Sequence, residues 1–243
     1  MKNRMRFPPP TPLVKTILFV ITGCFVTQLT LEVWMGQTWV QWLALFPEPG
    51  LHTLWQIFSY PIYQSPRVFD FLLGAVFFWW CVSPYELAFG KRLTLGLLVV
   101  SSLASAIPVV LFGAFFSDAG SLATVAIGPL TASPLFSINP HILGVIAAYA
   151  WSMRFRGNMN LFGMLSLSSK QLLLLLLAIT GLQFLATTNI TMVLADLGAI
   201  GGGLWFTEQL SKGPKTRKKK KPENKAGLRV VQGGKDDPPQ WLN

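Results

Sequence analysis

Long runs of apolar residues that carry almost no charge constrain this chain more than any other feature of its sequence. Each run approaches the roughly 20 residues with which a helix crosses a bilayer. Backbone amides in hydrocarbon must be hydrogen-bonded within the protein, so runs of this length predict helices rather than strands. We therefore expect an all-α polytopic membrane protein with six transmembrane helices, over residues 13–33, 68–84, 93–116, 136–153, 171–187 and 190–210.

The composition also favours a membrane protein over a soluble one. Hydrophobic residues make up 51% of the chain and charged residues only 12%, whereas a soluble domain is about one quarter charged. Cys24 and Cys81 both lie inside apolar runs, where a free thiol behaves as a small hydrophobic side chain. Their spacing indicates neither a disulfide framework nor a zinc site, so we expect no metal and no cofactor.

The charged residues divide the chain into three parts. Residues 1–12 form a short segment that we expect in the cytoplasm, residues 13–210 form the membrane domain, and residues 211–243 form a basic, disordered cytoplasmic tail. Much of the net charge of +10 lies in this tail, so the charge does not indicate binding to nucleic acid. The lysine cluster of the tail can be attracted to anionic lipid, at roughly 1 kcal/mol per cation, or can serve only to fix the topology.

The positions of the cations predict the orientation of the spans. The first run is longer than the core of a secretory signal, so we expect it to be retained as a span. If all six runs cross the membrane, the cation clusters fall on one side: Lys2, Arg4 and Arg6, then Lys91 and Arg92, then Arg154 and Arg156, then the tail. The loops on the other side carry Glu32, Glu48 and Asp118, with Arg67 as their only cation. The positive-inside rule therefore places both termini in the cytoplasm.

The loop after the first run, residues 34–66, is long and rich in tryptophan. Indole rings favour the membrane–water interface, so we expect this segment to lie there. An ordinary extracytoplasmic loop with scattered aromatic residues is the alternative.

Two short stretches flank the second run. Leu54-Trp-Gln-Ile-Phe-Ser-Tyr60 precedes it, and Pro84-Tyr-Glu-Leu-Ala-Phe-Gly90 follows at its end. With a short fourth run and small residues on the sixth, they resemble the rhomboid superfamily of intramembrane serine proteases, in which a Trp-Arg-x-x-Thr-Tyr stretch leads into span two. The resemblance covers roughly residues 13–210 and implies a six-transmembrane-helix, rhomboid-like bundle.

The resemblance also implies where a catalytic dyad would stand. Active rhomboids open span four with Gly-x-Ser-Gly, and the similar stretch here, residues 137–149, has Asn139 at the nucleophile position and Pro140 at the following glycine. Asp196 stands where the family has its span-six histidine. Phe69 and Leu73 occupy the oxyanion positions of span two and offer no donor. Since an amide is no nucleophile, the pattern is typical of a pseudoprotease without catalytic residues.

The polar residues of spans four and six leave several interpretations open. A rebuilt site would need Ser137 or Ser133 as nucleophile and His141 as base, but Pro140 lies between Ser137 and His141. An aspartate near the middle of a span costs about 2.5–3.5 kcal/mol, so Asp196 needs compensation. It is either a neutral carboxylic acid that donates one hydrogen bond to a neighbouring helix, or part of a polar groove with Asn139 and His141.

Small residues on the sixth run predict close helix packing. Gly198 and Gly202 are four positions apart, as are Ala199 and Gly203, and such spacing lets helix backbones approach each other. The resemblance implies that span six packs against span four at these residues.

We therefore expect a catalytically inactive, rhomboid-like membrane protein. It would bind transmembrane segments of client membrane proteins, as inactive relatives in the superfamily do in trafficking or quality control, and it would contact membrane lipids but no nucleic acid. An active rhomboid-family intramembrane serine protease is the alternative. A polytopic transporter ranks third, because transporters usually show several intramembrane charges or an inverted repeat.

Overall fold

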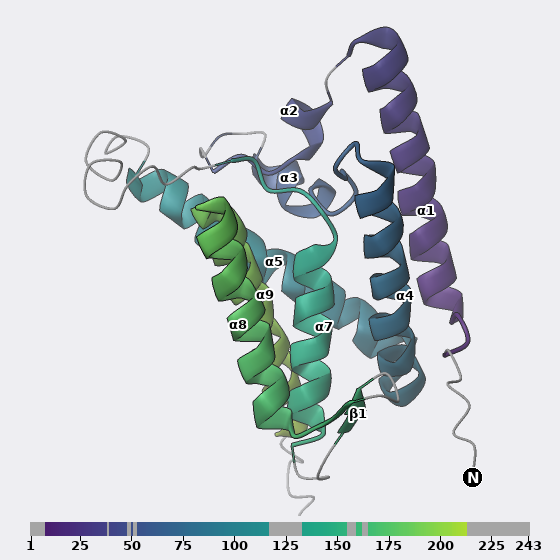
Figure 1. Cartoon of the computed structure of the whole chain (residues 1–243), viewed down its shortest axis with the longest axis vertical. Coiled ribbons are helices and arrows are strands. Elements are labelled where there is room, and N and C mark those ends of the chain that lie inside the picture. Colours follow the sequence, from purple (N-terminus) through teal and green to yellow (C-terminus); the bar gives the residue numbers. More distant parts are fainter. Residues whose placement is uncertain are drawn as a thin grey trace, which may run out of the picture. The chain divides into compact units, whose positions relative to one another are not determined.

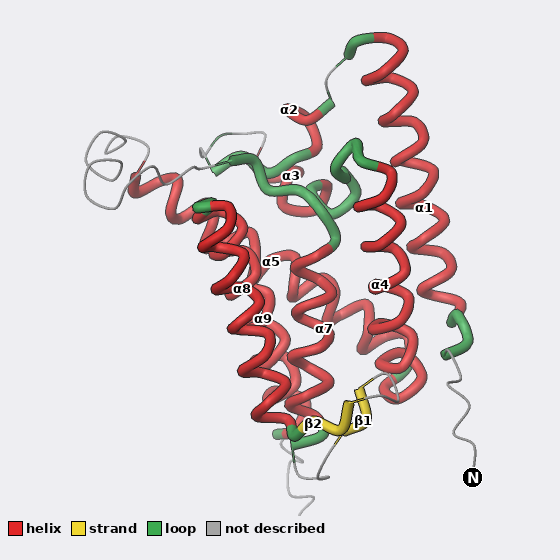
Figure 2. Tube along the Cα trace, viewed as in Figure 1, coloured by secondary structure: helices red, strands yellow, loops and turns green. Residues whose placement is uncertain are grey.

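The computed structural model describes residues 8–37, 39–47, 50, 53–116, 133–154, 159–161 and 165–212. Several sequence-based expectations concern residues outside these ranges: the cations of residues 2–6, Glu48, Asp118, Arg156 and the basic tail beyond residue 212. The described part is helical apart from one short pair of strands (Figures 1 and 2).

The long helices coincide with the predicted apolar runs. They are α1 (Pro12–Leu29) with its π-helical continuation η1 (Thr30–Trp34), α4 (Val68–Phe89), α5 (Lys91–Phe116), α7 (Asn139–Ser152), α8 (Ser169–Thr187) and α9 (Ile190–Ser211). The short helices α2 (Val40–Leu43) and α3 (Thr53–Ser59) lie between α1 and α4 in the chain. Strands β1 (Met159–Leu161) and β2 (Leu165–Leu167) pair antiparallel between α7 and α8.

Five of the described helical segments are long and apolar enough to cross a membrane: Pro12–Trp34, Val68–Phe89, Lys91–Phe115, Ser169–Thr187 and Ile190–Ser211. The prediction of a helical, multi-pass membrane protein is confirmed at this level. The predicted end of the second run at residue 84 was wrong, because α4 continues through Pro84 to Phe89. A proline removes one backbone hydrogen bond but does not end a membrane helix whose neighbours support it.

The short helix α7 is the centre of the bundle. Its 14 residues extend over only about 21 Å at 1.5 Å per residue, less than the roughly 30 Å of hydrocarbon in a bilayer. It packs against α4, α5, α8 and α9, and most of its side chains are buried. Figure 1 shows α7 between α4 on one side and α8 with α9 on the other. Protein rather than lipid therefore surrounds most of this helix.

The extended segment that leads into α7 is also bonded to protein. Leu135 forms a two-way backbone bridge with Leu45, and the Ser137 amide donates to the carbonyl oxygens of Tyr60 and Tyr63. Non-helical backbone at membrane depth is tolerated where protein satisfies its polar groups. These bonds attach the entrance of α7 to the segment that carries α2 and α3.

Glycines bring α9 against α5 and α7. A Cβ atom added at Gly198 would overlap the carbonyl oxygen of Ala104 on α5, and one at Gly203 would overlap the carbonyl oxygen of Gly144 on α7. A Cβ at Gly202 would overlap the Ala104 side chain, whereas Gly201 faces open space. The small residues of α9 thus contact both α5 and α7, so the contact with α5 adds to the expected packing of span six against span four. We call the side of α7 that faces α5 and α9 the sealed side.

The tryptophan-rich segment before α4 is held by buried polar side chains. Gln56 is fully buried, donates to the Gln41 carbonyl oxygen and accepts from the Phe46 amide. Trp34, Trp42 and Trp55 are largely exposed, as an interfacial segment requires. Its place in the membrane interface stays a prediction.

A buried carboxylate joins α1 to the end of α4. Glu86 accepts hydrogen bonds from the Thr11 hydroxyl and, at 3.3 Å, from the Leu13 amide. A negative charge at the first turn of a helix is favourable because unpaired amides point outward there. At the same end of the bundle, Glu208 of α9 accepts from Arg154 at 3.0 Å and from the Trp151 indole at 2.9 Å.

Candidate functional site

A cavity of about 760 Å³ lies on the side of α7 opposite the sealed side. Its walls are the first turns of α4, α7 and α9 and the last turns of α8, together with the extended segment of residues 135–137. Leu73 and Phe77 of α4 and Ile179 of α8 supply apolar surface. Helices α4 and α8 are not packed against each other. We call the side of the bundle between them, where the cavity lies, the open side.

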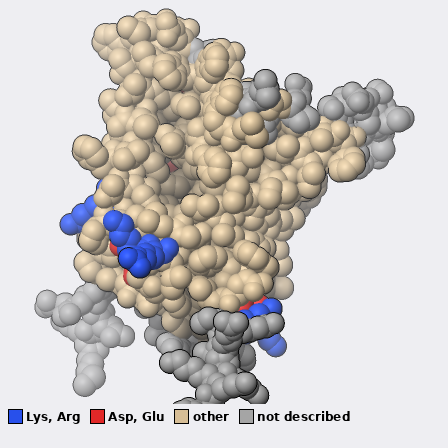
Figure 3. All heavy atoms as spheres, turned by 180° about the vertical axis from the view of Figure 1, so that it is seen from behind, with Lys and Arg blue, Asp and Glu red and all other residues tan. Residues whose placement is uncertain are grey.

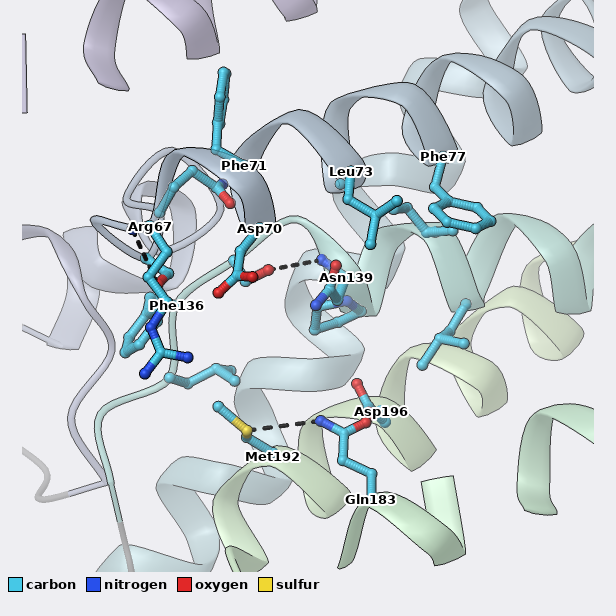
Figure 4. Close-up of a pocket in the computed structure, with 18 of the residues that line it drawn as sticks. Arg67, Asp70, Phe71, Leu73, Phe77, Phe136, Asn139, Gln183, Met192 and Asp196 are labelled. Carbon is cyan, nitrogen blue, oxygen red and sulfur yellow. Dashed lines mark hydrogen bonds between the residues drawn. The ribbon is translucent and has the colours of Figure 1, made fainter. Parts of the chain in front are cut away.

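Asn139 and Asp196 line this same cavity. Asn139 is the first residue of α7, and Asp196 stands in the second turn of α9. Figure 4 shows the Asp196 side chain directed from α9 into the cavity, with Asn139 nearby on α7. The two residues that the resemblance aligned with a catalytic dyad therefore share one space, and no hydrogen bond joins them.

The Asp196 side chain is buried but has no partner of its own. The residue is 4% exposed, and its carboxyl group forms no hydrogen bond or ion pair with any described residue. Three other carboxyl groups have partners: Glu32 accepts from Tyr63, Glu86 from Thr11, and Glu208 from Arg154. Asp70, in the wall of the same cavity, is exposed and has no hydrogen bond or ion pair with a described residue. Burial of a polar group without a hydrogen bond is costly, and Asp196 is a largely buried carboxyl group without a protein partner that borders the open space of the cavity.

Other polar groups line the cavity at several depths. Arg67 immediately precedes α4, and Asp70 follows one turn later. The Gln183 amide points toward the sulfur of Met192 at 3.7 Å, a weak interaction (Figure 4). The cavity wall thus holds two carboxyl groups and one guanidinium, and sequence reasoning had missed Arg67 and Gln183.

His141 lies on the other side of α7. Its Nε2 atom is 2.8 Å from the Ser102 hydroxyl of α5, while Nδ1 has no hydrogen-bond partner among the described residues. It lines a separate, mostly apolar cavity of about 320 Å³ between α1, α4 and α5. Residues two positions apart on a helix point in nearly opposite directions, so His141 does not join Asn139 and Asp196 in one groove.

Neither serine considered for a rebuilt dyad contacts His141. Ser137 has a positive φ of 104° and precedes the helix, and its hydroxyl accepts from the Asn139 amide at 3.2 Å. Ser133 is hydrogen-bonded to the Asn189 side chain. The serine that does meet His141 is Ser102, which sequence reasoning missed because one serine among small residues in an apolar run gives no pattern.

The two span-two positions aligned with oxyanion donors differ in location. Phe69 is 73% exposed and is not among the cavity residues, while Leu73 lines the cavity. Neither side chain can donate a hydrogen bond. The described part of the chain also contains no group of three or more His, Cys, Asp or Glu side chains that could hold a metal ion.

Comparison with known proteins gives no match, either to a family model or to a curated sequence. Function therefore has to be argued from the cavity and the residues that line it.

Proposed function

We propose that this chain is a rhomboid-like membrane protein without peptidase activity, in which α7, the fourth of six spans, is also the shortest. It binds single transmembrane helices of client proteins at the open side, between α4 and α8. The observation that carries the proposal is the 760 Å³ cavity with Asn139 and Asp196 in its wall and apolar side chains at its edges.

The size and surface of the cavity suit a helix. A helix with its side chains is about 10–12 Å wide and rises 5.4 Å per turn, so one turn fills roughly 400–600 Å³. A volume of about 760 Å³ therefore accommodates between one and two turns. Leu73, Phe77 and Ile179 at the edges are each partly exposed, and such apolar side chains can contact a helix that approaches from the lipid.

The chemistry of the site favours binding over cleavage. The amide of Asn139 cannot act as a nucleophile, and the hydrogen bonds of Ser133 and Ser137 go to Asn189 and Asn139 rather than to His141. Purified protein in lipid should therefore neither cleave model transmembrane substrates nor react with fluorophosphonate probes. Labelling that disappears on Ser137→Ala, Ser133→Ala or Ser102→Ala would revive the active-protease alternative.

We further propose that both termini face the cytoplasm. Among the described residues, every Lys and Arg except Arg67 lies near the end of the bundle where α1, α5 and α8 begin. In the view of Figure 3, the visible Lys and Arg gather over the lower part of the face. Reporters fused after Lys91 and after Asn243 should both report cytoplasm, and a far-side report from Asn243 would remove one span and the rhomboid comparison with it.

Helix binding can be tested by photocrosslinking in lipid vesicles. A photoreactive amino acid at Leu73 in the cavity should crosslink to a co-reconstituted single-span peptide of leucine and alanine. The matched control is Leu111, which is half-exposed on α5 away from the cavity. Equal crosslinking from both positions, or crosslinks to lipid alone, would contradict a binding site at the open side.

A further inference from the structure

The unpartnered carboxyl group of Asp196 gives the open side a chemical preference. We propose that the cavity selects transmembrane helices that carry an N–H donor, a lysine, arginine, asparagine or glutamine, at the depth of Asp196. This inference rests on the proposed function and names the kind of client that the same site recognises.

The Asp196 carboxyl group is free to accept a hydrogen bond from a group that enters the cavity. It is buried, directed into the cavity and unpaired, although donors line the same cavity (Figure 4). Arg67 immediately precedes α4 and forms no ion pair with either aspartate. The Asn139 side chain and the Gln183 amide also leave Asp196 without a hydrogen bond. A carboxyl group in this position is satisfied only by water or by a donor that enters the cavity.

The other charged groups that line the cavity with Asp196 lie at the start of α4. Asp70 on α4 adds a second carboxyl group, Arg67 supplies one guanidinium at the rim, and α7 and α8 present only neutral groups, Asn139 and Gln183. Arg67 and Asp70 are both exposed, whereas Asp196 is buried and keeps an unpaired acceptor in the cavity wall. A donor on the client completes this arrangement, whereas an acidic client residue would meet two carboxyl groups.

The depth of the donor follows from the position of Asp196 on its helix. It lies six positions after Ile190, the first residue of α9, which corresponds to roughly 9 Å at 1.5 Å per residue. A matching client helix carries its donor within the same outer part of the membrane, near the end where α4, α7 and α9 begin. Long lysine and arginine side chains extend further and tolerate a shift of about one turn.

The expected gain in affinity is moderate. Hydrogen bonds between membrane helices contribute about 0.6 kcal/mol on average and up to about 2, which corresponds to roughly 3- to 30-fold tighter binding. Such a preference distinguishes polar membrane segments from fully apolar ones but does not exclude the latter.

The test uses the full-length protein in lipid vesicles and fluorescent single-span peptides that differ at one position. Energy transfer measures the affinity for peptides with lysine, glutamine, leucine or aspartate at the matching depth, and for a lysine peptide with its cation near the opposite end. We expect lysine and glutamine to bind about 3- to 30-fold tighter than leucine, aspartate to bind weakest, and the displaced lysine to give no advantage.

Variants at Asp196 assign the preference to this residue. Asp196→Leu should abolish the difference between the lysine and leucine peptides, and Asp196→Asn, which keeps size and polarity, should reduce it. Asp70→Asn is the control for a general effect of negative charge and should leave most of the preference. If the leucine peptide binds as tightly as the lysine peptide, or if Asp196→Leu keeps the preference, the inference is wrong. If no peptide binds at all, the proposed function itself fails.

Discussion

The two sides of α7 show opposite ways of packing a helix in one bundle. On the sealed side, Gly144, Gly198 and Gly203 leave no space for a single added carbon between α7, α9 and α5. On the open side, the same helix borders a cavity of about 760 Å³. Because one face of α7 is packed this closely, generally loose packing of the bundle does not explain the cavity on the other face. The difference indicates that the open side is kept free for something to occupy it.

Breaking the sealed side should have the largest effect. Gly198→Ala places a methyl group against the backbone of Ala104, and overpacking of this kind usually costs about 1–3 kcal/mol. The matched control is Gly201→Ala on the same helix, which meets nothing within 4 Å. Denaturant unfolding in detergent micelles should show a large loss for Gly198→Ala and little change for Gly201→Ala. Equal losses would contradict contact with α5 as the cause, because helix propensity by itself favours alanine over glycine at both positions.

The satisfied carboxylate provides the next largest effect. Glu86→Ala removes the acceptor for Thr11 and for the first-turn amide of Leu13, and a buried donor left unpaired costs about 1–3 kcal/mol. Hydrogen exchange should increase at the start of α1, while α9 keeps its protection. Glu86→Gln retains one acceptor oxygen, so its hydrogen exchange at the start of α1 should lie between that of the unmodified protein and that of Glu86→Ala. Unchanged exchange at α1 in Glu86→Ala would contradict a role for this carboxylate in holding the helix.

The unsatisfied carboxyl group should behave in the opposite way. Asp196→Leu removes a buried acceptor without leaving any protein donor unpaired, and such replacements are often neutral or stabilising. We expect the unfolding midpoint to stay the same or to rise by an amount equivalent to less than about 1 kcal/mol. Capture of donor-bearing helices should fall in the same variant. A strong loss of stability would show that Asp196 has a structural partner after all.

The smallest effect is expected on the open side of α4. A Cβ at Gly74 would lie at ordinary contact distances, 3.7 Å from Ile138 and 3.9 Å from the Asn139 side chain. Gly74→Ala should therefore change stability by no more than about 0.5 kcal/mol, in contrast to the same substitution at Gly198. Parallel unfolding curves of the two variants measure how unequal the two sides of α7 are.

The apolar runs were sufficient to predict the helices, because the cost of unpaired backbone groups in hydrocarbon leaves few other structures. The ends of the helices were predicted less well: a proline such as Pro84 often ends a helix, but here it lies within α4. The common cavity of Asn139 and Asp196 followed only from aligned motifs, not from periodicity. The grouping of His141 with Asn139 came from their nearness in sequence, whereas helix geometry places residues two positions apart on nearly opposite faces, and His141 lines a different cavity. The cavity volume depends on which helices do not pack against each other, and no local sequence pattern predicts this.

The shortness of α7 has a consequence for the surrounding lipid. The outer helices are long enough for a bilayer of ordinary thickness, but at the open side α7, which extends over about 21 Å, forms part of the wall between α4 and α8. A bilayer adapts to such a local mismatch by thinning, at a cost of fractions of a kcal/mol per Å. Thinning beside the open side would lower the barrier for a polar side chain to enter from the lipid. Reconstitution in lipids of increasing chain length should therefore weaken the binding of donor-bearing helices before it affects the fold.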